Sequence, residues 1–254
     1  MAIASGRAGT ITPTDWTIFE DLFWGRYLTT GQIALRHYNA TSSCRRRLSQ
    51  LKAKGYIHNR IFYTIAPTRN SFGKRESVWH LSKEAFEMLA ESFDRDDAWN
   101  ARQLGPERAD HYLKANEVYM ASKENLDSIL GPYPEWEWRH EGRAYENWQL
   151  AGESRVHQPD AHVLIRDNLF IVERQTEASN KGPEEIRDKV ADHKTYVTKL
   201  LEMDPEQVEI LFACDDDRVP EIARRAGNDY GIHVVAGDVQ KVAFHLYQSA
   251  LRLK

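Results

Sequence analysis

The stretch QPDAHVLIRDNLFIVERQ, residues 158–175, constrains the fold more than any other segment of this chain. Two runs of β-branched and apolar residues flank the polar pair Asp167-Asn168. Such a pattern predicts two antiparallel strands joined by a tight turn. One acid, Asp160, stands at the start of the first strand, and another, Glu173, stands near the end of the second. Because the strands run in opposite directions, we expect both acids at the same end of the hairpin.

The segments around this hairpin predict a mixed sheet with helices packed on its faces. Two short apolar runs, 208–215 and 231–237, are typical of strands buried on both faces. Amphipathic segments predict helices, and these cover residues 111–130, 183–202, 219–227 (ending at Gly227) and 238–254. Alternation around Trp136 and Trp138 predicts a further strand, with the tryptophans in the core or, as an alternative, as a stacking platform for bases. The expected order is α-β-β-β-α-β-α-β-α.

The N-terminal third predicts a winged helix. Three helical segments follow one another, 13–26, 28–38 and 42–55, the third capped by Ser42 or Ser43 and ending at Gly55. Two alternating strands come next, and the polar loop PTRNSFGKRE separates them. The third helix has Cys44, Leu48 and Leu51 on one apolar stripe. This pattern indicates DNA binding, with protein binding or dimerisation through the same fold as the alternative.

The cationic residues favour nucleic acid as the partner. The net charge of -4 would argue against it, but residues 41–80 hold nine Lys and Arg against the single acid Glu76. Long cationic and amide side chains suit phosphates and base edges. The predicted contacts from the third helix are Ser43, Arg45, Arg46, Arg47, Gln50 and Lys54. Those from the wing are Arg69, Lys74 and Arg75.

The composition and the polar segments predict two domains. We expect a flexible N-terminus over residues 1–12, a winged-helix domain over 13–92, a linker over 93–109 and an α/β domain over 110–254. No apolar run has the length of a membrane span, and the start has no hydrophobic signal core. The two cysteines are too few for a disulfide framework or a zinc cluster. The expected location is the cytoplasm.

The strand order and the acid positions resemble the PD-(D/E)XK, or restriction-endonuclease-like, superfamily. The matching residues are Pro159-Asp160 and the ERQ segment that runs from Glu173 to Gln175. The resemblance implies that Asp160 and Glu173 bind Mg²⁺ or Mn²⁺ and that the third residue positions a water. Gln175 departs from the usual lysine, because an amide supplies no positive charge. Lys189 on the following helix is the candidate replacement, although we expect Lys189 and His193 to be ordinary residues flanking its apolar stripe.

Several segments together resemble the replication-relaxation family of plasmids and mobile elements. They are RRRLSQLKAKGYI, VWHLSKEAFEML, HYLKANEVYMA, QPDAHVLI and FIVERQTEAS, within residues 15–201. The resemblance implies a protein that handles double-stranded DNA in replication, relaxation or mobilisation. A relaxase or replication protein is an implied partner, and a homodimer is a further option.

Three functions remain open from the sequence. The first is a DNA-binding protein without a required cofactor, and the second is a Mg²⁺- or Mn²⁺-dependent endonuclease using Asp160 and Glu173, with Gln175 and Lys189 assisting. The third is a winged-helix transcriptional regulator. The absence of a glycine-rich phosphate loop argues against a nucleotide sensor.

Overall fold

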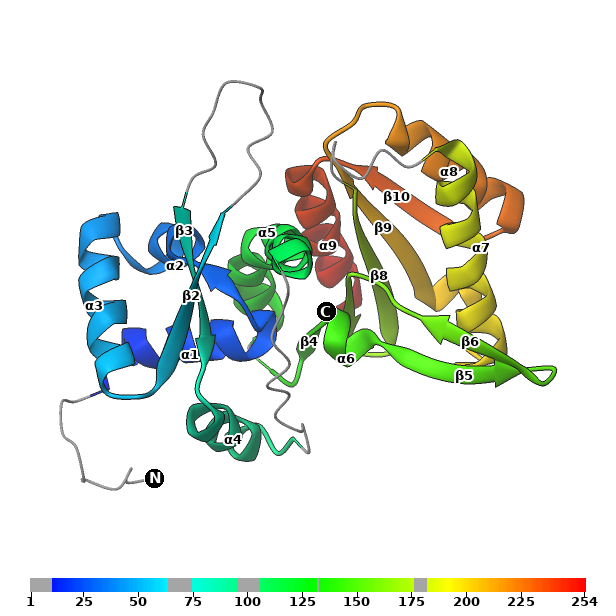
Figure 1. The fold of residues 1–254 in the computed structure, drawn as a ribbon. Coiled ribbons are helices and arrows are strands. Elements are labelled where there is room, and N and C mark those ends of the chain that lie inside the picture. Colours follow the sequence, from blue (N-terminus) through cyan, green and yellow to red (C-terminus); the bar gives the residue numbers. More distant parts are fainter. Residues whose placement is uncertain (1–10, 64–74, 96–105, 132, 176–181) are drawn as a thin grey trace. The chain divides into compact units, whose positions relative to one another are not determined.

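The computed structural model describes residues 11–63, 75–95, 106–131, 133–175 and 182–254 (Figure 1). The chain forms two compact units, the first ending at Ala109 and the second beginning at Asp110. Most of the expected N-terminal tail and linker lie outside the described residues. Helix α5 begins at Pro106, inside the segment expected to be the linker.

The first unit is a helical cluster with a small antiparallel sheet. Its elements are α1 (Pro13–Gly25), β1 (Leu28–Thr29), α2 (Thr30–His37), α3 (Thr41–Ala53), β2 (Ile57–Tyr63), β3 (Arg75–Leu81) and α4 (Lys83–Ser92). The sheet order is β1-β3-β2, with Ile57 opposite Leu81. Helices followed by a β2–β3 hairpin are the element order that a winged helix requires, and β1 is a short addition that the sequence did not predict.

Local capping explains where these helices begin. Thr12 and Asp15 form a capping box at α1, and Thr29 and Gln32 form one at α2. The prediction that Ser42 or Ser43 caps α3 is wrong. The N-cap residue is Ala40, whose backbone is extended, and the helix begins at Thr41. Ser42 and Ser43 therefore lie inside the first turn, and Ala40 offers no side-chain cap.

The core of the first unit contains the apolar stripe of α3. Cys44, Leu48 and Leu51 are all 0% exposed, as the sequence predicted. Phe19 and Phe23 of α1 are buried as well and contact other aromatic rings of this unit. Since burying each large side chain contributes roughly 1.5–3 kcal/mol, the stripe holds α3 against α2 and β2 and leaves the opposite face of α3 to solvent.

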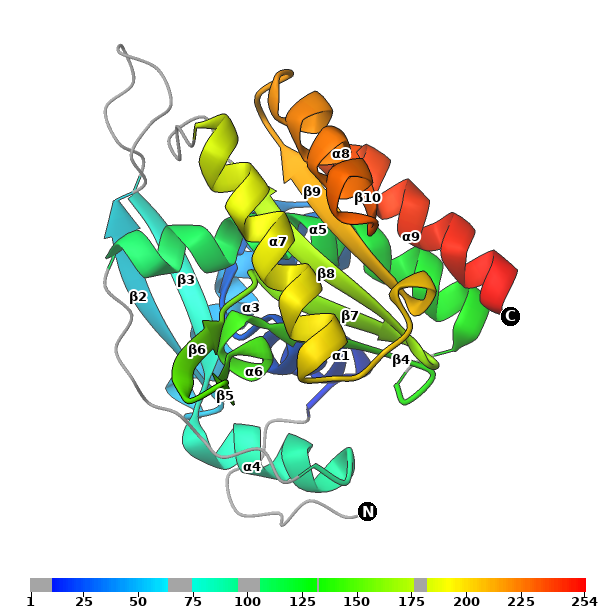
Figure 2. The ribbon, with the colours of Figure 1, turned by 90° about the vertical axis from the view of Figure 1, so that its right-hand side faces the viewer.

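The second unit is a mixed sheet between helices (Figure 2). Its first half comprises α5 (Pro106–Leu130), β4 (Trp136–His140), α6 (Glu141–Ala144), β5 (Glu146–Leu150), β6 (Glu153–His157), β7 (Ala161–Ile165) and β8 (Asn168–Gln175). The second half comprises α7 (Pro183–Lys199), η2 (Pro205–Gln207), β9 (Val208–Cys214), α8 (Val219–Tyr230), β10 (His233–Gly237) and α9 (Val239–Leu253). Helices α7 and α8 cover one face of the sheet, and α5 and α9 cover the other (Figure 1).

The five-stranded sheet has the order β10-β9-β8-β7-β4. β10 and β8 pair in parallel with β9, whereas β7 pairs antiparallel with β8 and with β4. This arrangement confirms the predicted mixed sheet with helices on its faces. Trp136 and Trp138 of β4 are buried, so the core interpretation of these tryptophans is also confirmed.

A second hairpin, β5–β6, was not predicted. It forms its own two-stranded sheet, with Glu146 opposite His157. The turn at Ala151-Gly152 has positive φ at both residues, which matches the twist of a two-residue hairpin. Only two of its side chains, Trp148 and His157, are buried, so the apolar pattern was too sparse to predict strands.

Helix α8 extends beyond the predicted end. Its expected stop at Gly227 is wrong, since the helix continues to Tyr230 and ends at Gly231, where φ is +65°. A Cβ on Gly227 would lie 2.5 Å from Cγ2 of Val234 and 2.8 Å from the carbonyl oxygen of Ile232. Gly227 therefore allows α8 to approach β10 closely, and Gly231 supplies the left-handed residue that ends the helix.

The described residues contain no helix with the length and hydropathy needed to cross a membrane.

Candidate functional site

The exposed face of α3 carries the predicted DNA contacts. Arg45, Arg46, Ser43 and Gln50 are exposed, and Lys54 is half-buried. They surround the helix on the sides that the apolar stripe leaves free. Of the predicted wing contacts, Arg69 and Lys74 lie outside the described residues, and Arg75 begins β3.

Arg47, which was also predicted as a DNA contact, is held inside the unit. Its Nε donates to Oδ1 of Asp15 at 2.7 Å, its Nη2 donates to Oδ2, and its Nη1 donates to Gln50 at 3.0 Å. Asp15 is 0% exposed. Burial raises the pKa of this carboxyl, but the hydrogen bonds from Arg47 and Thr12 outweigh it and hold the pKa below its ordinary value. Arg47 therefore fixes α3 to α1.

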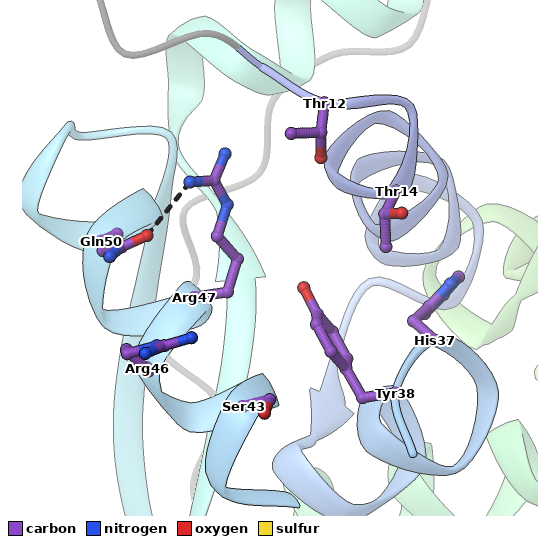
Figure 3. Close-up of a pocket in the computed structure, with 8 residues that line it drawn as sticks. All are labelled: Thr12, Thr14, His37, Tyr38, Ser43, Arg46, Arg47 and Gln50. Atoms are coloured by element: carbon purple, nitrogen blue, oxygen red, sulfur yellow. Dashed lines mark hydrogen bonds between the residues drawn. The ribbon is translucent and has the colours of Figure 1, made fainter. Parts of the chain in front are cut away.

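A polar pocket lies between α3 and the first turn of α1, next to this ion pair (Figure 3). Thr14 and Tyr38 line it from one side, and Ser43, Arg46 and Arg47 line it from α3. The hollow has a volume of about 370 Å³. Sequence reasoning found the α3 side of this pocket but missed Tyr38, because only the tertiary structure brings the end of α2 beside α3.

In the second unit, the hairpin turn sets the register of the two acids. Ile165 faces Asn168, so the turn is Arg166-Asp167 and the predicted turn at Asp167-Asn168 is off by one residue. Ala161 faces Val172 in the same register. Asp160 directly precedes β7 and Glu173 directly follows Val172 in β8, so both acids lie at the same end of the hairpin.

Glu173 lies at the centre of a buried charge cluster. It is 0% exposed in β8, and its Oε2 accepts a hydrogen bond from Nζ of Lys189. Its Oε1 pairs with Nε2 of His193 at 2.9 Å. The expectation that Lys189 and His193 merely flank the α7 stripe is wrong, because that stripe packs on the face of β8 to which Glu173 points. Burial raises the pKa of Glu173, but the charge of Lys189 and the contact with His193 hold it well below its ordinary value.

Asp160 is held by a different set of partners. Its Oδ2 accepts the backbone N–H of Arg174 at 2.5 Å, and its Oδ1 pairs with Nε2 of His111 at 2.5 Å. The bond to Asp160 raises the pKa of His111 against the opposing effect of burial. His111 was not predicted as a site residue, since the α5 sequence gives no sign that it faces β7.

Gln175 follows on the same strand face as Glu173, as expected. Its side chain is only 4% exposed and makes no hydrogen bond to another residue in the described ranges. Gln175 is therefore placed beside the charge cluster without taking part in it.

Arg174 points to the opposite face of β8. Its Nη2 donates to Glu117 of α5 at 3.0 Å and to Asp215 at 2.6 Å, and the side chain is only 3% exposed. Glu117 therefore forms ion pairs with both Arg174 and Lys114. The side chain of Arg174 thus connects α5 to the sheet, and the backbone N–H of Arg174 connects Asp160 to β8.

Three aromatic residues cover the Glu173 cluster, and the sequence did not point to the two histidines among them. Nε2 of His157 lies 3.0 Å from Nε2 of His162, and the ring of Tyr196 stacks on His157 with centroids 3.4 Å apart. Burial lowers the pKa of His157 to about 2 and that of His162 to about 3. Both of these imidazoles are therefore neutral at ordinary pH.

The donor set does not fit a divalent metal as it is arranged. Each of the four carboxylate oxygens of Asp160 and Glu173 already accepts a proton donor or pairs with an imidazole, and one donor is an ammonium group. Mg²⁺ usually binds through one or two carboxylates that are free to coordinate it. Within the described ranges, no group of three His, Cys, Asp or Glu could hold a metal ion. A metal would have to displace Lys189 or His111.

The second unit is an α/β domain whose mixed five-stranded sheet has helices on both faces. The replication-relaxation family model matches residues 20–207, which is more than half of the chain. The chain belongs to the replication-relaxation family.

The chain is also similar to solved structures at low identity. Protein VC1899 from Vibrio cholerae is 15% identical with a TM-score of 0.41, over 82% of this chain and 43% of that protein. Restriction endonuclease FokI bound to DNA is 10% identical with a TM-score of 0.31, over 97% of this chain and 47% of that protein. The chain thus spans less than half the length of either. No curated protein matches it.

Proposed function

We propose that this chain binds double-stranded DNA through the first unit, acting as a winged helix, in the replication, relaxation or mobilisation of plasmid or mobile-element DNA. The observation that carries the proposal is the exposed face of α3. Arg45 and Arg46 are exposed there, and the buried stripe of Cys44, Leu48 and Leu51 anchors the helix from behind. Membership of the replication-relaxation family supports the same partner.

In this proposal the second unit is a scaffold for DNA or for a protein partner such as a relaxase or replication protein. The buried ion pair between Glu173 and Lys189 supports a structural role for this unit. Arg174 supports it as well, because its bonds to Glu117 and Asp215 join α5, β8 and the end of β9.

The salt dependence of DNA binding tests the proposal. Neutralising about four phosphates gives a slope of about -4 in log K against log salt. Fluorescence anisotropy with a labelled duplex measures this slope for the wild type and for Arg45→Ala. The matched control is Lys83→Ala, which changes an exposed lysine of α4 in the same unit. A wild-type slope near zero, or equal losses from Arg45→Ala and Lys83→Ala, would contradict the proposal.

A divalent-metal endonuclease is the second candidate, favoured by the hairpin register, which brings Asp160 and Glu173 to the same end of β7 and β8. Since both carboxylates are engaged by protein groups, Mg²⁺ or Mn²⁺ would bind only after Lys189 or His111 released them. Incubating plasmid with Mn²⁺ and either the wild type or Asp160→Ala decides the matter. Nicking by the wild type but not by Asp160→Ala would support the endonuclease. Equal nicking by the two proteins would assign the nicking activity to a contaminant.

A further inference from the structure

The pocket beside α3 presents hydrogen-bond donors that no other described residue uses. The hydroxyl groups of Tyr38 and Ser43 and the guanidinium of Arg46 all line it, and none bonds to another residue in the described part of the chain. Figure 3 shows the Tyr38 hydroxyl pointing into the space between Thr14 and Arg47. These groups come from α3 and from the residue that follows α2, and they converge on one hollow.

The carboxylate and amide oxygens around the pocket are already occupied. The carboxylate of Asp15 accepts Arg47 through both oxygens and also accepts the N–H and the hydroxyl of Thr12, at 2.7 and 2.8 Å. Oε1 of Gln50 accepts Nη1 of Arg47. No acid among the described residues pairs with Arg46, so Arg46 gives the pocket a positive charge. A small anion with several acceptor oxygens fits this combination.

A backbone phosphate of DNA meets these requirements better than a base edge. A phosphate offers only acceptors and carries a full negative charge to pair with Arg46. The edges of adenine and cytosine also present amino donors, which would need the oxygen of Gln50 that Arg47 holds, and the guanine edge presents acceptors but no charge. Charge-assisted hydrogen bonds to phosphate are also the stronger kind. The pocket adjoins the exposed face of α3, so a phosphate held here would set the position of that helix on the duplex.

We infer that the pocket formed by Tyr38, Ser43 and Arg46 seats one backbone phosphate of bound DNA. The inference rests on the proposed DNA-binding function and adds a contact that the α3 sequence did not indicate. Tyr38 donates its hydroxyl, Arg46 supplies the charge, and Arg47 with Asp15 keeps the two walls of the pocket at a fixed spacing.

The variant Tyr38→Phe tests the seat, because it removes one hydroxyl that has no described protein partner and leaves the ring in place. We expect about tenfold weaker duplex binding from the loss of a hydrogen bond to a charged group. The salt slope should stay unchanged, since no charge is removed. Arg46→Gln should weaken binding and also reduce the slope by about one.

Tyr56→Phe is the matched control, since Tyr56 lies in the same unit outside the pocket lining. Equal thermal denaturation midpoints for the wild type, Tyr38→Phe and Tyr56→Phe would show that all three proteins fold alike. If the wild type shows salt-dependent binding but Tyr38→Phe binds as tightly as Tyr56→Phe, the phosphate seat is wrong and the proposed function stands. If the wild type shows no such binding, both fail.

Inorganic phosphate separates a DNA phosphate from a free anion. At constant ionic strength, phosphate should compete with the duplex for the wild type and much less for Tyr38→Phe. Two results together would overturn the inference: free phosphate shifts the Tyr38 ring resonances, and Tyr38→Phe leaves the affinity for the duplex unchanged. The pocket would then bind a free anion and not a DNA phosphate.

Discussion

Replacing Lys189 with methionine tests whether the ion pair with Glu173 stabilises the second unit. Glu173 is 0% exposed and the Lys189 side chain is 23% exposed, so the substitution leaves a buried carboxylate with only His193 beside it. Removing one partner of a buried pair costs about 3–5 kcal/mol. Since His193 remains, we expect a loss in the free energy of unfolding near the lower limit, about 3 kcal/mol at pH 7.

The pH dependence of this loss has a definite sign. In the wild type the pKa of Glu173 is lowered, so its stabilising contribution is complete above the unfolded-state pKa of about 4.3. That contribution disappears as the pH falls through the lower folded-state pKa. In Lys189→Met the positive charge beside Glu173 is gone, so the burial of Glu173 raises the pKa of its carboxyl. Protonation of Glu173 then relieves the buried charge as the pH falls. The difference from wild type should therefore shrink between pH 7 and pH 5.

Urea titration at both pH values measures the effect, and hydrogen exchange of the β8 amides assigns it to the second unit. The double variant Lys189→Met/Glu173→Gln should recover most of the stability, because no buried charge remains. Lys199→Met changes an exposed lysine on the same helix and should cost less than about 0.5 kcal/mol. A loss for Lys189→Met no larger than for Lys199→Met, or a double variant no more stable than the single one, would refute the reasoning.

Two further substitutions test the packing and capping of the fold. Gly227→Ala should lower the free energy of unfolding by about 1–3 kcal/mol in urea titration, because its Cβ would meet Val234 and the Ile232 carbonyl; an unchanged midpoint would contradict the close approach of α8 to β10. Thr29→Ala removes the side-chain cap of α2 and should cost about 1 kcal/mol, measured by thermal denaturation. Thr41→Ala, at the first position of α3, is the control, and equal effects of the two would argue against the capping box.

Much of the fold follows from local patterns in the sequence. The apolar stripe of Cys44, Leu48 and Leu51 predicted the buried face of α3 because helical periodicity alone decides which residues share a face. The strand order of the second unit follows from alternating and continuous apolar runs. The predicted end of a helix was less accurate where it depended on contacts with residues distant in the sequence. Gly227 resembles a helix stop, but its packing against Val234 explains its presence within α8.

The candidate site divides in the same way between sequence and tertiary structure. The sequence by itself determined that Asp160 and Glu173 share one end of a hairpin, because antiparallel pairing relates residues that are close along the chain. Only the tertiary structure decided that Lys189 meets Glu173 and that His111, 49 positions before Asp160, meets that acid. Those contacts depend on how α7 and α5 dock on opposite faces of the sheet. The sum of many side-chain contacts sets this docking, and no short sequence pattern encodes it.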